Sequence, residues 1–469
     1  MTRRQVLQSA ALSVPVLRVR GQAAKPSTSP EVEQILARIR PPTFRNQDFE
    51  IRKYGAVPGG EKPATDAIRS AIEACSKAGG GRVVVPAGVF LTGAVHLESN
   101  VNLHIAKDAT LKFSQNHKDY PIVFTRFEST ECMNFSPFIY AWEKQNIAVT
   151  GEGTLDGQAD ADHWWPLRKR QARTAGEGDP QDDRKRLVDM GNTHVPVRER
   201  VFGEGHTLRP NFVQPYRCQN VLLEDFTVIN SPMWELNPVL CKNVTVRNVK
   251  IDSHGPNNDG CDPECSEDVL ISNCVFSTGD DCIAIKSGRN EDGRRVNVPC
   301  SNIVIRDCLM KDGHGGVSIG SEVSGGIKNV FIDNCQMSSP HLERGLRIKT
   351  NSYRGGVIDN IHFEHITIGE VAQAAVEVDF FYEEGKGGPF KPDVKNIYIT
   401  DVTSKKSKYG IFLRGFPDAP ITGVTISHCR FDNAANSNLF QDVASVKLED
   451  VLVNGKPVTA NEARQSKNS

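Results

Sequence analysis

The chain has 469 residues, a formal net charge of −1, and a composition that is 38% hydrophobic and 7% aromatic. The near-neutral charge argues against a general polyanion binder such as a nucleic-acid coat, so affinity for an acidic ligand must come from a local basic cluster. The composition suits a folded protein, and no stretch approaches the roughly 20 consecutive apolar residues of a membrane-spanning helix.

The N-terminus carries a candidate export signal. Arg3-Arg4 precedes a mildly apolar run that ends at Leu17, a pattern typical of twin-arginine signals. We expect residues 1–24 to direct export to the periplasm or the medium by this route. The alternative is a disordered basic terminus, which the charges of Arg18 and Arg20 favour. Residues 25–45, rich in Pro and Ser, are expected to form a linker.

An amphipathic helix is expected next. It covers Thr65 to Ala78 and ends at three successive glycines, which break the helix and permit a left-handed C-cap. One face carries the apolar residues Ile68, Ala71, Ile72 and Cys75. Such a helix suits a cap over the open end of a stacked hydrophobic core.

Short β-branched segments then recur along the chain. Each opens with Asn, Asp or Gly followed by an aliphatic residue, and the openers are Asn220, Asn243, Asp268, Asn302, Asn329, Asn360, Asn396 and Gly423. Uneven spacing between similar strands is typical of the coils of a parallel β-helix. A leucine-rich solenoid would need a Leu/Asn framework that is missing, and a propeller would need longer units. We expect one all-β domain over residues 46–457, followed by a tail at 458–469.

Three strand-like runs and one long loop also belong to this expected domain. Strand-like runs at 82–85, 100–105 and 146–149 would form the first coils. A long polar stretch between His163 and Asn211, which carries Trp164 and Trp165, is expected to be a functional loop on the rim.

The repeat also indicates which cysteines are buried in the core. The residues six positions after the openers are Phe226, Val249, Cys274, Cys308, Cys335, Ile366, Val402 and Cys429. All are apolar or cysteine, which predicts one interior column where cysteine acts as a small buried hydrophobe. Cys261 and Cys265 have no partner pair at zinc-like spacing, so no metal site is expected. Cys282 and Cys300 flank a charged loop and are candidates for a disulfide in an exported protein.

The coil register brings charged residues together. Asp280 lies twelve residues after one opener and His314 twelve after the next, so we expect them to be neighbours on one face. Asp259 precedes the matching strand of the previous coil, and Asp281 is adjacent to Asp280. Crowded carboxylates raise the pKa of one of them, which keeps a neutral acid available for proton transfer.

Three cations accompany these acids. Lys286, Arg347 and Lys349 follow alternating aliphatic residues and are expected to point outward beside the acids. Taken singly, each such acid would be a turn cap and each cation a solvated strand residue. The combination in four adjacent coils favours a catalytic surface.

Four motifs in this order resemble the polygalacturonase family, glycoside hydrolase family 28. They are Asn258-Asp259, Gly279-Asp280-Asp281, Gly313-His314-Gly315 and Arg347-Ile348-Lys349, and the resemblance spans Tyr54 to Val451. It implies a right-handed, single-stranded parallel β-helix that hydrolyses α-1,4-linked galacturonan in pectin with inversion. Inversion implies carboxyl groups roughly 6.5–9.5 Å apart.

The resemblance also assigns roles to residues. Asp280 would be the general acid, Asp259 and Asp281 would share the general base, and His314 would tune the acid. Arg347 and Lys349 would hold the galacturonate carboxylate, with Lys286 beside them. Tyr382 would line the sugar subsite, although a packing aromatic is an equal interpretation.

Three segments resemble exo-acting members, in which extra loops close the groove into a pocket for a chain end. They are the loop bearing Trp164 and Trp165, the segment Ser231–Trp234, and the insertion 288–300. Two positions depart from the family pattern, Asn258, where many members have Thr, and Asn237, where many have His.

Three alternatives stay open. A rhamnogalacturonan hydrolase would share the fold and acids, but it is expected to lack the His and Arg-x-Lys set. A pectate lyase would bind Ca²⁺ through several acids, and a non-catalytic β-helix protein would have no reason for this charge cluster. We expect a monomer with no cofactor or metal and no nucleic-acid partner, acting on an acidic polysaccharide.

Overall fold

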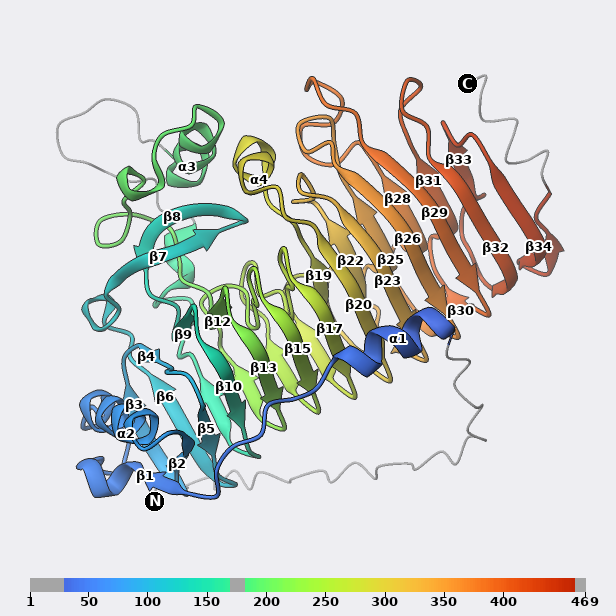
Figure 1. The fold of residues 1–469 in the computed structure, drawn as a ribbon. Coiled ribbons are helices and arrows are strands. Elements are labelled where there is room, and N and C mark those ends of the chain that lie inside the picture. The colour runs from blue at the N-terminus through green and yellow to red at the C-terminus, as the bar shows by residue number, and fades with distance from the viewer. Residues whose placement is uncertain (1–28, 169–181, 460–469) are drawn as a thin grey trace, which may run out of the picture.

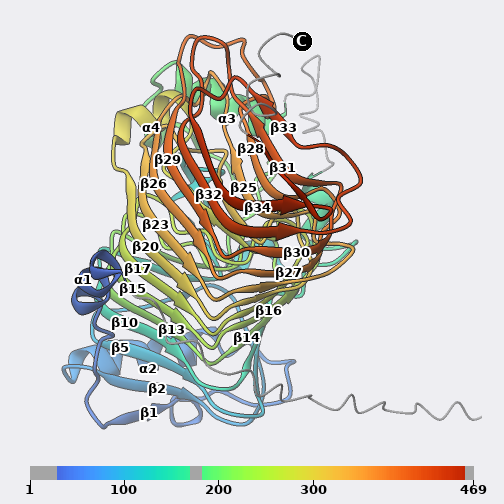
Figure 2. The same ribbon diagram turned by 90° about the vertical axis from the view of Figure 1, so that its right-hand side faces the viewer.

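The computed structural model describes residues 29–168 and 182–459. The predicted export signal lies outside the described residues, as does most of the predicted C-terminal tail. The described chain winds into a right-handed parallel β-helix, which confirms the predicted fold. Its coils stack from the blue N-terminal end to the red C-terminal end (Figure 1), and the turned view shows the strands aligned in rows (Figure 2).

Three rows of parallel strands form the helix. The first row contains β1 (Asp48–Glu50), β2 (Gly81–Val85), β5 (Val101–Ile105), β10 (Gln145–Thr150), β13 (Gln219–Glu224), β15 (Lys242–Arg247), β17 (Glu267–Ser272), β20 (Cys300–Arg306), β23 (Ile327–Asp333), β26 (Val357–Glu364), β29 (Asp393–Thr400), β32 (Thr422–Phe431) and β34 (Val446–Val453). The second contains β3 (Gly88–Thr92), β6 (Ala109–Phe113), β11 (Thr154–Asp156), β14 (Thr227–Ile229), β16 (Lys250–Ser253), β18 (Val275–Thr278), β21 (Leu309–Met310), β24 (Gln336–Met337), β27 (Thr367–Glu370) and β30 (Thr403–Lys406).

The third row is interrupted but continuous in register. It contains β4 (Val95–His96), β9 (Ile139–Trp142), β12 (Val213–Tyr216), β19 (Ile283–Ile285), β22 (Val317–Gly320), β25 (Arg344–Lys349), β28 (Ala374–Asp379), β31 (Tyr409–Arg414) and β33 (Leu439–Gln441). Single bridges through Leu236 and Cys261 connect β12 to β19. A short antiparallel strand, β35 (Lys456–Pro457), pairs with β34 at the C-terminal end.

The strand openers share one backbone conformation. All eight have φ between 55° and 64°, the left-handed region that Gly, Asn and Asp adopt most readily. Their side chains also form a ladder between coils: Asn243 donates to Asn220 at 2.7 Å and Asn329 donates to Asn302 at 2.9 Å. The repeat of Asn and Asp is therefore required by the turn that begins each coil.

The interior column predicted from the repeat is confirmed, since all eight of its side chains are buried. All twelve cysteines are free and buried, so the proposed disulfide between Cys282 and Cys300 is wrong. The thiol of Cys282 instead donates to the carbonyl of Asp312, and that of Cys300 to the carbonyl of Pro263. Both therefore act as core residues, like the cysteines of the column.

The predicted capping helix is confirmed as α2 (Thr65–Lys77), which lies at the N-terminal end of the stack (Figure 1). Its face of Ile68, Ala71, Ile72 and Cys75 is buried in the main core. The cap removes the first coil's apolar interior from water.

The expected linker at 25–45 is wrong for much of its described part, because it contains the helix α1 (Pro30–Arg38). Ser29 caps the helix by accepting from the Val32 amide, and Ile35 is buried against Val304 and Phe331. The helix thus packs on the outer face of β17 and β20. Its apolar contacts with distant coils offset the cost of ordering the segment.

The insertions gather on one side of the stack, above the third row (Figure 1). They are the antiparallel hairpin β7 (Ile122–Phe127) and β8 (Thr130–Phe135), the helices α3 (Asp183–Asn192) and α4 (Asn290–Val296), and short 3-10 turns at Trp165–Arg168 and Val197–Glu199; two further 3-10 turns lie at Ile51–Tyr54 and His117–Asp119. None of the helices described here is long and apolar enough to cross a membrane.

Candidate active site

The candidate site lies on the outer side of the third row. Ile283 of β19 pairs with Val317 of β22, which pairs with Leu346 of β25. In this register the amide of His314 donates to the carbonyl of Asp280 at 3.0 Å. The predicted adjacency of these two residues in consecutive coils is therefore correct.

A cavity of about 380 Å³ opens over these strands. It is lined by Glu128, Arg168, Arg184, Trp234, Asn257, Asp259, Asp280, Lys286, His314, Ser321, Glu322, Glu343, Arg344, Arg347, Lys349, Tyr382 and Glu383. Seven of the eight predicted site residues are among them. The eighth, Asp281, is completely buried directly beneath the cavity floor.

Asp281 is held by two cations. The ammonium of Lys349 donates to Oδ2 at 2.6 Å, and the guanidinium of Arg347 approaches Oδ1 at 3.4 Å. Burial alone would raise the pKa of this carboxyl, but the charges of Lys349 and Arg347 hold it well below its usual range. Asp281 is therefore ionised at neutral pH.

Asp280 is the most accessible of the three acids. Its side chain is 19% exposed, against 4% for Asp259 and 0% for Asp281. Nδ1 of His314 lies 2.9 Å from its Oδ1. The hydrogen bond to Asp280 raises the pKa of His314 to about 8. The pair places a protonated imidazole beside the most accessible of the three aspartates.

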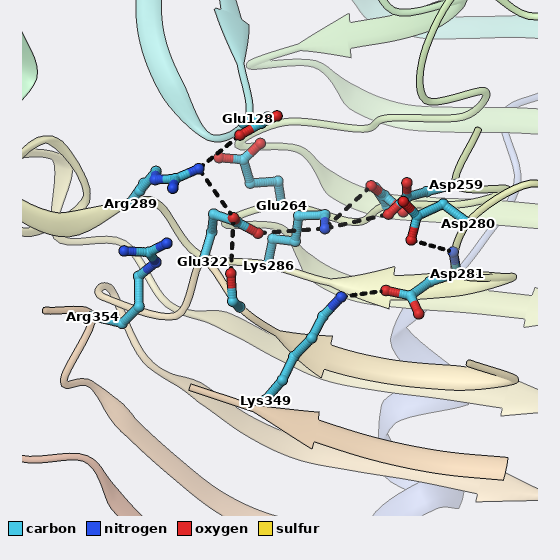
Figure 3. Close-up of polar contacts among 12 residues, drawn as sticks. Glu128, Asp259, Glu264, Asp280, Asp281, Lys286, Arg289, Glu322, Lys349 and Arg354 are labelled. Carbon is cyan, nitrogen blue, oxygen red and sulfur yellow. Dashed lines mark hydrogen bonds and ion pairs between the residues drawn. The ribbon is translucent and has the colours of Figure 1, made fainter. Parts of the chain in front are cut away.

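Asp259 shares a buried ammonium with two other acids. Nζ of Lys286 lies 3.5 Å from Asp259, 3.6 Å from Asp262 and 3.4 Å from Glu322 (Figure 3). It also lies 4.4 Å from the ring centroid of Trp234. Burial, with the charges of Asp262 and Asp280, raises the pKa of Asp259 well above its usual range. Asp259 thus retains a proton more readily than Asp281.

The cations are less accessible than the sequence predicts. Lys286, Arg347 and Lys349 lie on the outer side of the coils as expected, yet all three are buried. Lys286 lies against the ring of Trp234, and Arg347 and Lys349 lie near the ring of Tyr382. Their charges therefore act at short range in a medium that screens them weakly. Lys286 in particular contacts carboxylates of the protein rather than open solvent.

The three aspartates are closer than expected. One oxygen of each lies within 4.8 Å of one oxygen of the other two. The expectation of a wide separation, roughly 6.5–9.5 Å, does not hold for these nearest oxygens. The cations between the acids explain the crowding, because each carboxylate has a positively charged neighbour: Lys286 for Asp259, His314 for Asp280 and Lys349 for Asp281.

Two buried acids behind the site, Glu235 and Asp262, were not predicted from the sequence. Neither Glu235 nor Asp262 has a hydrogen-bond partner for its carboxylate oxygens among the described residues. Burial, with the charge of Asp259, raises the pKa of Glu235 well above its usual range, and burial raises the pKa of Asp262 likewise against the opposing charge of Lys286. Asp262 follows the bridge residue Cys261 in the register of the third row, and this position is the one signal that would have found it.

Five segments meet at one end of the cavity through a set of charged residues, which we call the rim cluster: Glu128, Arg184, Arg289, Glu383 and Arg354. Glu128, at the tip of the β7–β8 hairpin, accepts from Arg289 at 2.7 Å and from Arg184 of α3 at 2.5 Å. Glu383 accepts from Arg184 at 2.9 Å and from Arg354 at 2.7 Å. Two acids thus bridge three arginines and tie the insertions together.

The comparisons with known proteins now decide the family. The family model described as Glycosyl hydrolases family 28 matches residues 201–448, more than half of the chain. The chain belongs to this family. It is therefore a glycoside hydrolase, and the predicted resemblance is confirmed.

Similar proteins include exo- and endo-acting members. The chain is 42% identical to an exopolygalacturonase from Thermotoga maritima of known structure, with a TM-score of 0.87 over 91% of this chain and 96% of that one. It is 27% identical to an exo-poly-alpha-D-galacturonosidase of Dickeya chrysanthemi, over 88% of this chain and 75% of the other. An endo-polygalacturonase of Pectobacterium carotovorum subsp. carotovorum is 30% identical over 73% of this chain and 78% of its own length.

Two aromatic residues, Tyr382 and Trp234, line the cavity. The ring of Tyr382 lies near both cations, 5.4 Å from Arg347 and 5.2 Å from Lys349. Trp164 and Trp165 do not line it: the first is buried against Phe138, and the second donates to a backbone carbonyl. The tryptophan pair therefore anchors its loop through contacts within the protein.

The pH dependence of this site is predicted to depend on His314. Because its pKa is raised above the ordinary value of about 6.5, the charged hydrogen bond to Asp280 is present below that value and is lost as the pH rises through about 8. We expect kcat/KM to decline across the same range. The His314→Gln variant should lose this alkaline limb in a pH–rate profile, and an unchanged limb would assign it to another group.

Proposed function

We propose that the chain hydrolyses α-1,4-galacturonosidic bonds of polygalacturonate, releasing product from chain ends with inversion. One observation carries this proposal: an accessible acid, Asp280, lies beside an ionised one, Asp281, in a cavity that also presents buried cations. A general acid and a general base together catalyse glycoside hydrolysis, and cations in a low-dielectric site bind an anionic sugar.

The roles of the acids follow from their surroundings. Asp280 is the general acid, because it faces the cavity and can reach a glycosidic oxygen. Asp281 is the general base, because Lys349 and Arg347 keep it ionised and able to accept a proton from water. Asp259, with its raised pKa, helps to hold the water and shares its proton with the neighbouring aspartates.

The substrate's carboxylate binds on the cation side of the cavity. Arg347 offers a planar fork that matches a carboxylate, and Lys349 adds a point charge. The ring of Tyr382 lies over both cations and forms a surface for the sugar. Lys286 contributes through Asp259 rather than by direct contact with sugar.

The exo mode is supported by the rim cluster. A polymer bound between internal residues needs a groove open at both ends, whereas the rim cluster joins five segments across one end of the cavity. The exo-acting relatives named above support the same mode.

Location and assembly follow from the substrate. A pectin polymer is too large to enter a cell intact, so we propose that the enzyme is exported, to the periplasm or the medium, by the twin-arginine route. We further propose that it acts as a monomer whose single β-helix domain covers residues 46–457, with α1 packed on its outer face.

Product analysis on polygalacturonate tests this function. We expect only a short product from the first minutes of reaction, with the β-anomer formed first, as required by inversion of an α-linkage. Chromatography and proton NMR of early samples measure both. A ladder of oligomers would contradict the exo mode, and an unsaturated product that depends on Ca²⁺ would replace hydrolysis by a lyase reaction.

A further inference from the structure

Six lysine and arginine residues line the cavity: Arg168, Arg184, Lys286, Arg344, Arg347 and Lys349. Five have a carboxylate of the protein within ion-pair distance. Arg168 differs. It ends the 3-10 turn Trp165–Arg168, is exposed, and has no acidic partner among residues 29–168 and 182–459. An unpaired guanidinium beside a cavity is available to an anionic ligand.

A second uncompensated charge lies behind this position. Arg209 is buried, and its guanidinium donates to the carbonyls of Pro232 and Pro256 at 2.7 and 2.6 Å and to Oδ1 of Asn257 at 2.7 Å. These acceptors are all neutral, and its Nε has no partner within the described chain. Burial, and next the charge of Arg168, lowers the pKa of Arg209 to about 9. Two like charges therefore lie near each other, and neither forms an ion pair with a carboxylate of the described residues.

The amide of Asn257 completes a set of donors. Its Oδ1 accepts from Arg209, which fixes the side chain so that Nδ2 is left as a donor. Asn257 lines the cavity, and its left-handed backbone, with φ of 56°, begins the short segment that leads to Asp259. A guanidinium and an amide N–H₂ backed by a buried positive charge form a site that matches one carboxylate.

We propose that Arg168 and Asn257, backed by Arg209, form a second carboxylate-binding site for the substrate. It lies on the N-terminal side of Asp280, since Asn257 belongs to the preceding coil, the one that carries Asp259. Arg347 and Lys349 belong to β25, two coils after β19. The enzyme thus requires two unesterified galacturonates, one on each side of the bond it cleaves. This inference rests on the proposed function and extends it to tolerance of methyl esters.

The first test compares two variants on trigalacturonate. Arg168→Gln should raise KM by roughly 10–100-fold, the loss of a charge-assisted hydrogen bond, with a smaller effect on kcat. Arg198→Gln is the matched control, because Arg198 is exposed on the same insertion and does not line the cavity. Its KM should equal that of the unaltered enzyme. A KM for Arg168→Gln that matches the control would overturn the inference.

The second test removes the ligand charge instead. Each of the three single methyl esters of trigalacturonate is assayed with the unaltered enzyme and with Arg168→Gln. We expect one ester to raise KM for the unaltered enzyme and to have little further effect on the variant. If every ester raises the KM of both proteins by equal factors, Arg168 does not bind a carboxylate of the substrate.

These outcomes are distinct from failure of the proposed function. If the unaltered enzyme does not hydrolyse trigalacturonate or polygalacturonate, the function itself is wrong. If it hydrolyses both and Arg168→Gln behaves as the control, only the second carboxylate site is wrong.

Discussion

The Asp280→Asn variant is expected to lose roughly 10²–10⁴-fold in kcat on oligogalacturonate, the usual contribution of a positioned proton donor. Asn keeps the size of the side chain and can still hydrogen-bond to His314, but it has no proton of suitable acidity to give the leaving oxygen. KM and the melting temperature should change little, because Asp280 faces the cavity and supports no packing. Steady-state kinetics and thermal unfolding of the purified variant measure these quantities.

Its controls are the same change at the other two aspartates. Asp281→Asn should also abolish turnover, but it leaves Lys349 and Arg347 without their buried partner and should lower stability. Asp259→Asn should retain more activity than either, since Asp259 already tends to hold its proton. Full activity in Asp280→Asn, or a larger loss in Asp259→Asn, would assign the acid to Asp259.

The sequence was most informative where one residue type is required by backbone geometry. The strand openers must adopt a left-handed conformation, so Asn, Asp and Gly repeat and reveal the coils. Once the coils are aligned, the adjacency of Asp280 and His314 follows from counting. The fold and the acids of the site were therefore predictable without any knowledge of the insertions.

The insertions were not predictable in the same way. The rim cluster joins residues from five segments, and nothing local to Glu128 or Arg289 indicates that they meet. The helix α1 was missed because its short sequence contains Pro and is stabilised by tertiary contacts with Val304 and Phe331. Lys286 was found, but its role changed, because its three acidic partners lie in two different coils.

The second large effect, a loss of folding stability, is expected when Lys286 is replaced. In Lys286→Met the side chain keeps its length and its apolar contact with Trp234, but the ammonium between Asp259, Asp262 and Glu322 is lost. Removing one partner of a buried ion pair leaves uncompensated charge and costs about 3–5 kcal/mol. The exposed pair of Lys242 and Glu267 offers a control, because Lys242→Met removes a charge that water already screens and should cost about 1 kcal/mol at most.

Lys286→Met and Lys242→Met should also differ in the pH at which they lose stability to acid. Burial would raise the pKa of Glu322, yet the charges of Lys286 and Arg289 hold it well below its usual range. A carboxyl with a depressed folded-state pKa stabilises the protein above its unfolded value, about 4.5, and loses that contribution as the pH falls. Without Lys286 the depression is smaller, so Lys286→Met should lose stability at a higher pH than Lys242→Met in urea unfolding followed across pH. Equal stability of the two variants at every pH would mean that Lys286 does not hold the acids of the site in place, and that Asp259 is positioned by its backbone alone.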